Sequence, residues 1–140
     1  MQGDASMLKR TFYTACALFF ASSAYAATDC SNAEDQATMT KCASEELAAA
    51  DKKLNELYKT IEKRLADDHD TKKLLIAAQR AWIGFRDSEC TFAASGTDGG
   101  SIHPMMVAMC KTSLTKTRNE ELADYLKCEE GDLGCVVPAE

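Results

Sequence analysis

The stretch Leu47–Leu65, LAAADKKLNELYKTIEKRL, decides the fold. Its apolar residues recur at alternating gaps of three and four, which places them on one side of an α-helix. They are Leu47, Ala50, Leu54, Leu57, Ile61 and Leu65. Charged residues such as Lys52, Glu56 and Lys59 fall largely outside this stripe. The stretch therefore predicts an amphipathic helix that buries one stripe and exposes the rest to water.

The helix is expected to begin well before this stretch. Ser31-x-x-Glu34 matches a capping box, in which two side chains satisfy free backbone N–H groups at a helix start. Neither Pro nor Gly occurs from there until Gly84. A bridge between Cys30 and Cys42 would require the chain to fold back within eleven residues, which favours a break in the helix near Cys42.

A second helix is expected after the polar turn DDHD at residues 67–70, with Asp70 or Thr71 as its cap. Gly84 weakens this helix by up to about 1 kcal/mol relative to Ala. The glycine-rich loop at residues 95–101 ends it. The apolar residues assigned to its buried side are Leu75, Ala78, Trp82, Phe85 and Phe92.

A third helix is expected from Pro104, because proline suits the first turn of a helix. Its apolar side is expected to continue until Gly131 and comprises Val107, Cys110, Leu114, Leu122, Tyr125 and Leu126. No run alternates apolar and polar residues for long enough to predict a strand. Three helices with two short polar connections predict an all-α fold, a small antiparallel three-helix bundle stapled by disulfides.

Residues 1–26 have the composition of a secretory signal peptide. Lys9 and Arg10 supply positive charge, an apolar run follows at residues 12–21, and Ala-Tyr-Ala at residues 24–26 predicts cleavage before Ala27. The alternative, an uncleaved anchor, is disfavoured because the run is short for a bilayer, and no second apolar stretch of about 18 residues follows. We therefore expect a signal peptide at 1–26 and one helical domain with a C-terminal disulfide loop at 27–140, either periplasmic or secreted.

Charge disfavours one class of partner. Removal of residues 1–26 leaves 14 basic and 21 acidic residues, a formal charge of −7. An acidic surface repels phosphate backbones, so nucleic acid is not an expected partner. A basic protein or a cationic surface fits this charge better.

The cysteines indicate a disulfide framework. Cys16 leaves with the signal peptide, and an even number in a short exported chain remains: Cys30, Cys42, Cys90, Cys110, Cys128 and Cys135. Sequence alone allows 15 pairings. The simplest pairing joins neighbours, as Cys30–Cys42, Cys90–Cys110 and Cys128–Cys135. A zinc site needs closer Cys or His pairs, and the chain has only His69 and His103, so we expect neither a metal nor another cofactor.

Several polar residues fall at helical spacing on the sides that also carry apolar residues. They are Asp51, Asn55, Gln79, Arg86, Glu89 and Arg118. They form either a structural network between helices, in which Asp51 or Glu89 neutralises a buried arginine, or a polar cleft open to a substrate. The network is favoured because buried charges must be paired.

Catalytic patterns are weak in this chain, and we do not expect an enzyme. Both histidines fall in predicted loops without a nucleophile motif around them. Cysteines held in bridges provide no thiolate. Gly99-Gly100 lacks the flanking strand and the lysine of a phosphate-binding loop.

Several motifs resemble those of the LprI-type lysozyme inhibitor family. They are DCSNA at residues 29–33, ADxxLNxxY at 50–58, QxxWxxxRDxEC at 79–90, GGS at 99–101 and TxxRxxxL at 115–122, together with Cys42 and Cys110. The resemblance covers nearly all of the chain from Cys30 to Leu126, and QxxWxxxRDxEC is its most specific part. It implies an exported helical domain with paired cysteines and a role in binding and inhibiting lysozyme. The tail with Cys128 and Cys135 is not assigned to the shared pattern.

The leading hypothesis is an inhibitor of lysozyme-type muramidases, which are commonly basic. Such an inhibitor must place a loop in a cleft that holds two catalytic carboxylates. The loop at residues 96–104 is the candidate, with Ser101 and His103 as hydrogen-bond donors. The acidic loop with Glu129, Glu130 and Asp132 would add charge at the periphery, although both loops also fit solvated connections. The alternative hypothesis is an envelope interaction or stress-response module with another protein partner.

Overall fold

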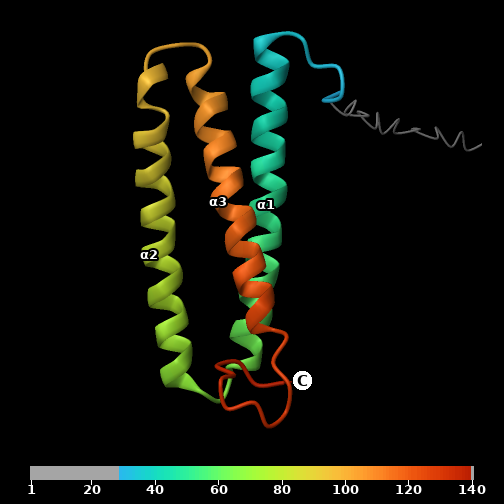
Figure 1. Cartoon of the computed structure of the whole chain (residues 1–140), viewed down its shortest axis with the longest axis vertical. Coiled ribbons are helices and arrows are strands. Elements are labelled where there is room, and N and C mark those ends of the chain that lie inside the picture. Colours follow the sequence, from blue (N-terminus) through green and yellow to red (C-terminus); the bar gives the residue numbers. More distant parts are fainter. Residues whose placement is uncertain (1–28, 140) are drawn as a thin grey trace, which may run out of the picture.

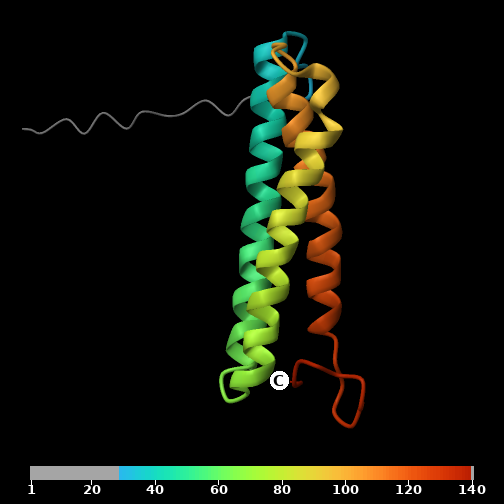
Figure 2. The ribbon, with the colours of Figure 1, turned by 90° about the vertical axis from the view of Figure 1, so that its left-hand side faces the viewer.

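The computed structural model describes residues 29–139, which form three long helices and one short 3-10 turn. The elements are α1 (Gln36–Arg64), α2 (His69–Ala93), η1 (Ser95–Thr97) and α3 (His103–Tyr125). The helices run side by side with alternating direction and form an elongated bundle (Figures 1 and 2). The predicted all-α three-helix bundle is confirmed. The predicted signal peptide at 1–26 and Cys16 lie outside the described residues.

Helix α1 begins later than the capping box predicted. Its N-cap is Asp35, whose carboxylate accepts hydrogen bonds from the backbone N–H and the hydroxyl of Thr38. Ser31 instead lies in a turn, where its N–H donates to Asp29. Aspartate is as good an N-cap as serine, and it occurs nearer the apolar stripe. The predicted start at Ser31 is therefore wrong.

The predicted break near Cys42 is also wrong, because α1 is continuous from Gln36 to Arg64. The Cys30–Cys42 bridge forms across a Cα–Cα distance of 5.7 Å. The fold-back that this distance requires occurs in residues 29–35, before the helix begins. The bridge thus ties the N-terminal segment to the side of α1.

Helix α2 begins at His69, and Asp68 is its N-cap through a hydrogen bond from the Thr71 N–H. Asp70 and Thr71 were predicted as caps, and both lie inside the helix. Helix α3 begins beside Pro104 as predicted, but it ends at Tyr125 rather than near Gly131. The last polar stretch of the chain forms turns instead.

The core lies toward the end of the bundle that holds the C-terminus. The stripe of α1 supplies most of it, with Leu54, Leu57, Ile61 and Leu65 buried as predicted. Leu122 of α3 and Val137 of the C-terminal tail complete it. The tail was predicted as a loop closed on itself, and its contribution to the core was not predicted. Figure 1 shows the tail folded across that end of the helices.

The buried side of α2 differs from the predicted one. Leu75 and Trp82 pack against the core as expected. Ala78, Phe85 and Phe92 do not, since Ala78 is exposed and the two phenylalanines are 53% and 76% exposed. Gln79 and Cys90 are buried instead, on a side about 120° away around the helix. On α3, Tyr125 is likewise exposed, while Thr112 and Thr115 are buried.

Three disulfides connect sequence neighbours: Cys30–Cys42, Cys90–Cys110 and Cys128–Cys135. The second joins α2 to α3 beside their connection, and the third closes the tail. Each bridge typically stabilises a fold by about 2–4 kcal/mol, mainly by restricting the unfolded chain. None of the helices in residues 29–139 has the length and apolarity needed to cross a lipid bilayer.

Candidate functional site

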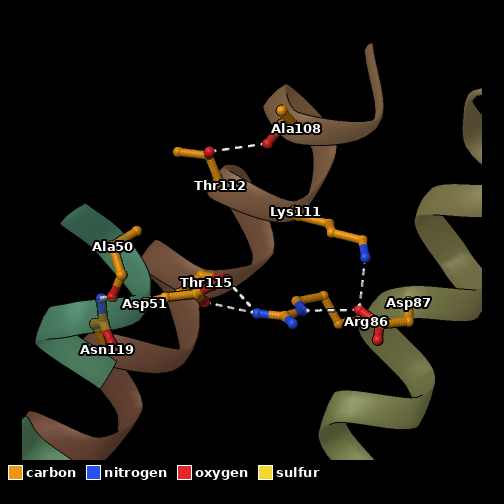
Figure 3. A network of polar contacts seen from close by, with 9 residues as sticks. All are labelled: Ala50, Asp51, Arg86, Asp87, Ala108, Lys111, Thr112, Thr115 and Asn119. Atoms are coloured by element: carbon orange, nitrogen blue, oxygen red, sulfur yellow. Dashed lines mark hydrogen bonds and ion pairs between the residues drawn. The ribbon is translucent and has the colours of Figure 1, made fainter. Parts of the chain in front are cut away.

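The guanidinium of Arg86 is the centre of a polar network between the three helices (Figure 3). Its Nη1 donates to Asp51 Oδ1 of α1 at 2.8 Å and to Thr115 Oγ1 of α3 at 3.1 Å. Its Nε donates to the neighbouring carboxylate of Asp87 at 3.2 Å. The Arg86 side chain is only 12% exposed. A charge buried to this degree requires such partners, because water no longer solvates it.

Asp87 extends the network to α3. Lys111 Nζ lies 3.0 Å from Asp87 Oδ1 and donates to it (Figure 3). The hydrogen bond from Lys111, with a smaller contribution from Arg86, lowers the pKa of Asp87 below its ordinary value of 3.8, although burial opposes this shift. The carboxylate is therefore held in its charged form.

Arg118 forms a second centre on α3. Its Nε donates to Gln79 Oε1 at 3.3 Å, and its Nη1 pairs with Glu121 at 2.7 Å. The ring of Trp82 is near both arginines, with its centroid 5.2 Å from the Arg86 guanidinium carbon and 6.0 Å from that of Arg118. Both distances are in the range of cation–π attraction. Trp82 thus links the two centres.

The structure brings together four of the six network residues named from the sequence: Asp51, Gln79, Arg86 and Arg118. The other two, Asn55 and Glu89, are exposed, and neither makes a hydrogen bond or ion pair to either arginine in residues 29–139. Asn55 instead lines an open hollow between α1 and α2. Both arginines have charged or polar partners, which is typical of a structural network.

Sequence reasoning missed several members of the network. Thr115 is fully buried and accepts from Arg86, and Asn119 donates to the Ala50 carbonyl oxygen at 3.1 Å (Figure 3). Thr112 is buried as well, with its hydroxyl bonded to its own helix. These residues recur at gaps of three and four on α3, so the same helical spacing could have identified them.

The connection between α2 and α3 is a braced loop at residues 95–102. η1 begins it, Gly99 adopts a φ of +73°, and the Gly100 N–H donates to the Thr97 carbonyl oxygen. His103 Nδ1 lies 3.1 Å from Thr97 Oγ1 and 3.2 Å from the Ala94 carbonyl oxygen. The Cys90–Cys110 bridge lies directly beneath the loop. These contacts hold the loop in one shape.

The two candidate donors in this region differ in orientation. Ser101 is exposed on the loop. His103 is half-buried, and its Nδ1 is engaged with the loop itself, so this nitrogen is not free to donate to a partner. In residues 29–139, no group of three or more His, Cys, Asp or Glu side chains is placed to hold a metal ion.

The acidic loop lies at the opposite end of the bundle (Figure 1). Glu129, Glu130 and Asp132 are exposed, and Asp132 also accepts from the Gly134 N–H at 2.8 Å. Helix α3 separates this loop from residues 95–102 by its 23 residues, about 34 Å. The two loops therefore cannot enter the same narrow cleft.

The model of the family described as "Lysozyme inhibitor LprI" matches residues 27–122. This chain belongs to the LprI family. The match includes both the arginine network and the braced loop, and it ends before the acidic tail. The LprI family is an inhibitor family rather than an enzyme family.

Two further proteins are similar to this chain. An uncharacterised protein of Rhizobium meliloti (strain 1021) is 35% identical over 113 residues, which cover 73% of this chain and 81% of that protein. The crystal structure of a DUF1311 family protein from Pseudomonas putida KT2440 superposes with a TM-score of 0.58 at 21% identity, covering 64% of this chain and 91% of that one. The latter similarity shows that the two share a fold.

Proposed function

We propose that this LprI-family protein is exported, loses residues 1–26, and inhibits a lysozyme-type muramidase by placing the loop at residues 95–102 in the active-site cleft. The observation that carries the proposal is the braced, exposed loop within the part of the chain that matches the family. A loop already held in one shape loses little entropy on binding, which favours affinity.

The chemistry of the loop suits a cleft with two carboxylates. The exposed Ser101 hydroxyl is a hydrogen-bond donor on the loop. Asp98 is the only charged residue of the loop, and its Oδ1 accepts from the Gly99 N–H at 3.0 Å. Its carboxylate is thereby directed along the loop's own backbone.

Net charge supports a basic partner. The mature chain carries a formal charge of −7, so long-range attraction would accelerate its encounter with a basic muramidase. Because α3 separates Glu129, Glu130 and Asp132 from the loop, we assign them to this attraction and not to the cleft. Added salt should therefore weaken binding, mainly through a slower association rate.

The test is lysozyme activity on a cell-wall suspension titrated with the mature, oxidised protein. We expect inhibition, and we expect Ser101→Tyr to raise the inhibitory concentration at least about tenfold by filling the space between loop and cleft. Ser113→Tyr is the matched control, since Ser113 is also exposed but lies on the side of α3. It should inhibit like the wild type.

Two results would contradict the proposal in different ways. An absence of inhibition at high micromolar protein would reject the inhibitor function and favour an envelope interaction module with another partner. If both Ser101→Tyr and Ser113→Tyr inhibit as strongly as the wild type, the loop is rejected as the binding site. N-terminal sequencing of protein from the periplasm or medium should start at Ala27, and material that starts at Met1 or Met7 would reject cleavage.

A further inference from the structure

The outer face of α2 carries large apolar side chains in contact with water. Leu74, Phe85 and Phe92 are 70%, 53% and 76% exposed. They are separated by 11 and 7 residues, so they lie on one side of the helix. Figure 2 looks onto α2 from outside the bundle. We define this outer face by eight exposed residues: Leu74, Ala77, Ala78, Ala81, Gly84, Phe85, Ser88 and Phe92.

The outer face is uncharged in a protein in which 27% of residues are charged. From Leu74 to Phe92 it extends about 27 Å along the helix. Its apolar side chains gain free energy by leaving water, and continuous apolar surface of this kind is uncommon on monomeric proteins. Small residues between the large ones would allow another helix to approach closely, and no atom lies within 4 Å of a side chain built at Gly84.

We propose that the outer face of α2 binds the same face of a second copy of this chain, with the two helices antiparallel. A two-fold axis near position 83 makes such an interface self-complementary. It places Leu74 opposite Phe92 of the second copy and Ala81 opposite Phe85 of the second copy. Each phenylalanine then meets a smaller residue, as knobs meet holes in packed helices.

An apolar hollow next to the outer face supports this register. It has a volume of about 200 Å³ and opens between α2, the end of α3 and the tail. Leu74, Ala78, Tyr125 and Val136 line it, and three of these four are large apolar side chains that remain exposed. Phe92 of the second copy, opposite Leu74, would lie at the mouth of this hollow. The hollow thus offers a place for the ring.

Charges along one edge of the face favour the antiparallel orientation and a second copy as the occupant. Lys73 and Arg80 lie on the edge in the first half of α2, and Asp87 lies on it in the second half. Antiparallel pairing places Arg80 near Asp87 of the second copy, whereas parallel pairing would place the two charged edges on opposite sides of the interface.

Sedimentation velocity of the mature, oxidised protein tests the proposal. We expect a reversible dimer with a dissociation constant in the micromolar range, and we expect Phe92→Asp to weaken it at least about tenfold. Leu133→Asp is the matched control, because Leu133 is fully exposed on the tail and lies outside the face. It should dimerise like the wild type. A wild type that stays monomeric at about 1 mM, or equal effects of the two variants, would overturn the proposal.

A second variant tests the orientation. Arg80→Ala should weaken an antiparallel dimer about two- to tenfold, because two exposed ion pairs are lost. Unchanged or tighter association would overturn the antiparallel arrangement, because only that arrangement brings Arg80 near Asp87 of the second copy.

The dimer does not depend on the proposed inhibition. Phe92→Asp should inhibit a muramidase like the wild type because the braced loop is unchanged. Loss of inhibition in Phe92→Asp, together with a monomeric wild type, would assign the face to the muramidase and overturn the dimer. Since Phe92 is mostly in water, the variant should fold, and an unchanged far-ultraviolet circular dichroism spectrum checks this.

Discussion

At the scale of single residues, Arg86 explains why a helical bundle with a modest core has a defined arrangement of helices. Its guanidinium reaches α1 through Asp51 and α3 through Thr115, and it is stacked near Trp82. Removing such a charge from water is costly, so only the arrangement that supplies all of its partners is stable. The network therefore stabilises one register of the three helices, because its donors and acceptors bind one another across the helices.

Replacing Asp51 by alanine should show the cost of leaving the buried Arg86 without its ion pair to α1. The free energy of unfolding should fall by about 1–3 kcal/mol, because Arg86 stays buried and loses its shortest ion pair. Urea denaturation measures the change. Asp124→Ala is the control, since Asp124 pairs with Lys127 on an exposed surface, and it should leave the free energy almost unchanged. Equal effects of the two substitutions would contradict the role of the buried arginine.

The lowered pKa of Asp87 predicts how the stability of the folded protein changes with pH. Its pKa in the folded protein is below the ordinary value of 3.8, chiefly because Lys111 donates to it. Acidification therefore protonates the unfolded chain first, and the stability that Asp87 contributes is present above pH 3.8 and is lost as pH falls through the folded pKa.

We expect Asp87→Asn to lose less stability than the wild type between about pH 5 and pH 2 in urea denaturation. Lys111→Met should behave similarly, since it removes the donor that lowers the pKa of Asp87. Identical acid dependence in the wild type and both variants would show that the Lys111–Asp87 contact does not act in solution.

At the scale of the elements, both long N-terminal helices begin at an aspartate followed three residues later by a threonine. Asp35 accepts from Thr38 before α1, and Asp68 accepts from Thr71 before α2. These hydrogen bonds, led in each case by the threonine side chain, lower the pKa of both carboxylates. A negative N-cap also interacts favourably with the helix dipole. The caps decide where each helix starts.

Substitutions at Asp35 and Ser31 should show which of these two residues caps the N-terminus of α1. Asp35→Ala should lower the midpoint of urea unfolding, because the Thr38 N–H loses its acceptor. Ser31→Ala should leave the midpoint unchanged, since the Ser31 hydroxyl does not cap α1. A lower midpoint for Ser31→Ala alone would instead support the capping box at Ser31.

At the scale of the whole molecule, the two ends of the bundle differ. One end holds the braced loop and two of the disulfides, and the other holds the core and the tail (Figure 1). The tail returns to the helices after the Cys128–Cys135 bridge, and Val137 is 2% exposed in the same core cluster as Ile61 and Leu122. The tail lies beyond the part of the chain that matches the family, yet it closes the family's fold in this protein.

Two adjacent valines test the role of the tail. Val137→Ala should lower the free energy of unfolding by about 1–2 kcal/mol, because it removes buried methyl groups from the core. Val136→Ala should have little effect on the monomer, since Val136 is 54% exposed. Urea denaturation at low protein concentration measures both. Equal and small effects would show that the tail does not pack on the helices in solution.

The sequence by itself determined the class of the fold and the family. The periodic stripe of residues 47–65 predicts a long helix buried on one side, and the same side is buried in the structure. The motif QxxWxxxRDxEC at residues 79–90 indicates the LprI family without any tertiary contact. Both inferences use short-range patterns, and the spacing of residues on a helix is a local property of the chain.

The tertiary structure alone decided which side of α2 faces its neighbours. The sequence of α2 has two sides with apolar residues, and periodicity assigned Phe85 and Phe92 to the interior. In the structure the interior side carries Gln79 and Arg86, because their partners on α1 and α3 are far away in sequence. The burial of Val137 likewise depends on residues more than 70 positions away. A polar side chain is stable inside only when distant partners reach it, and spacing along one helix does not contain that information.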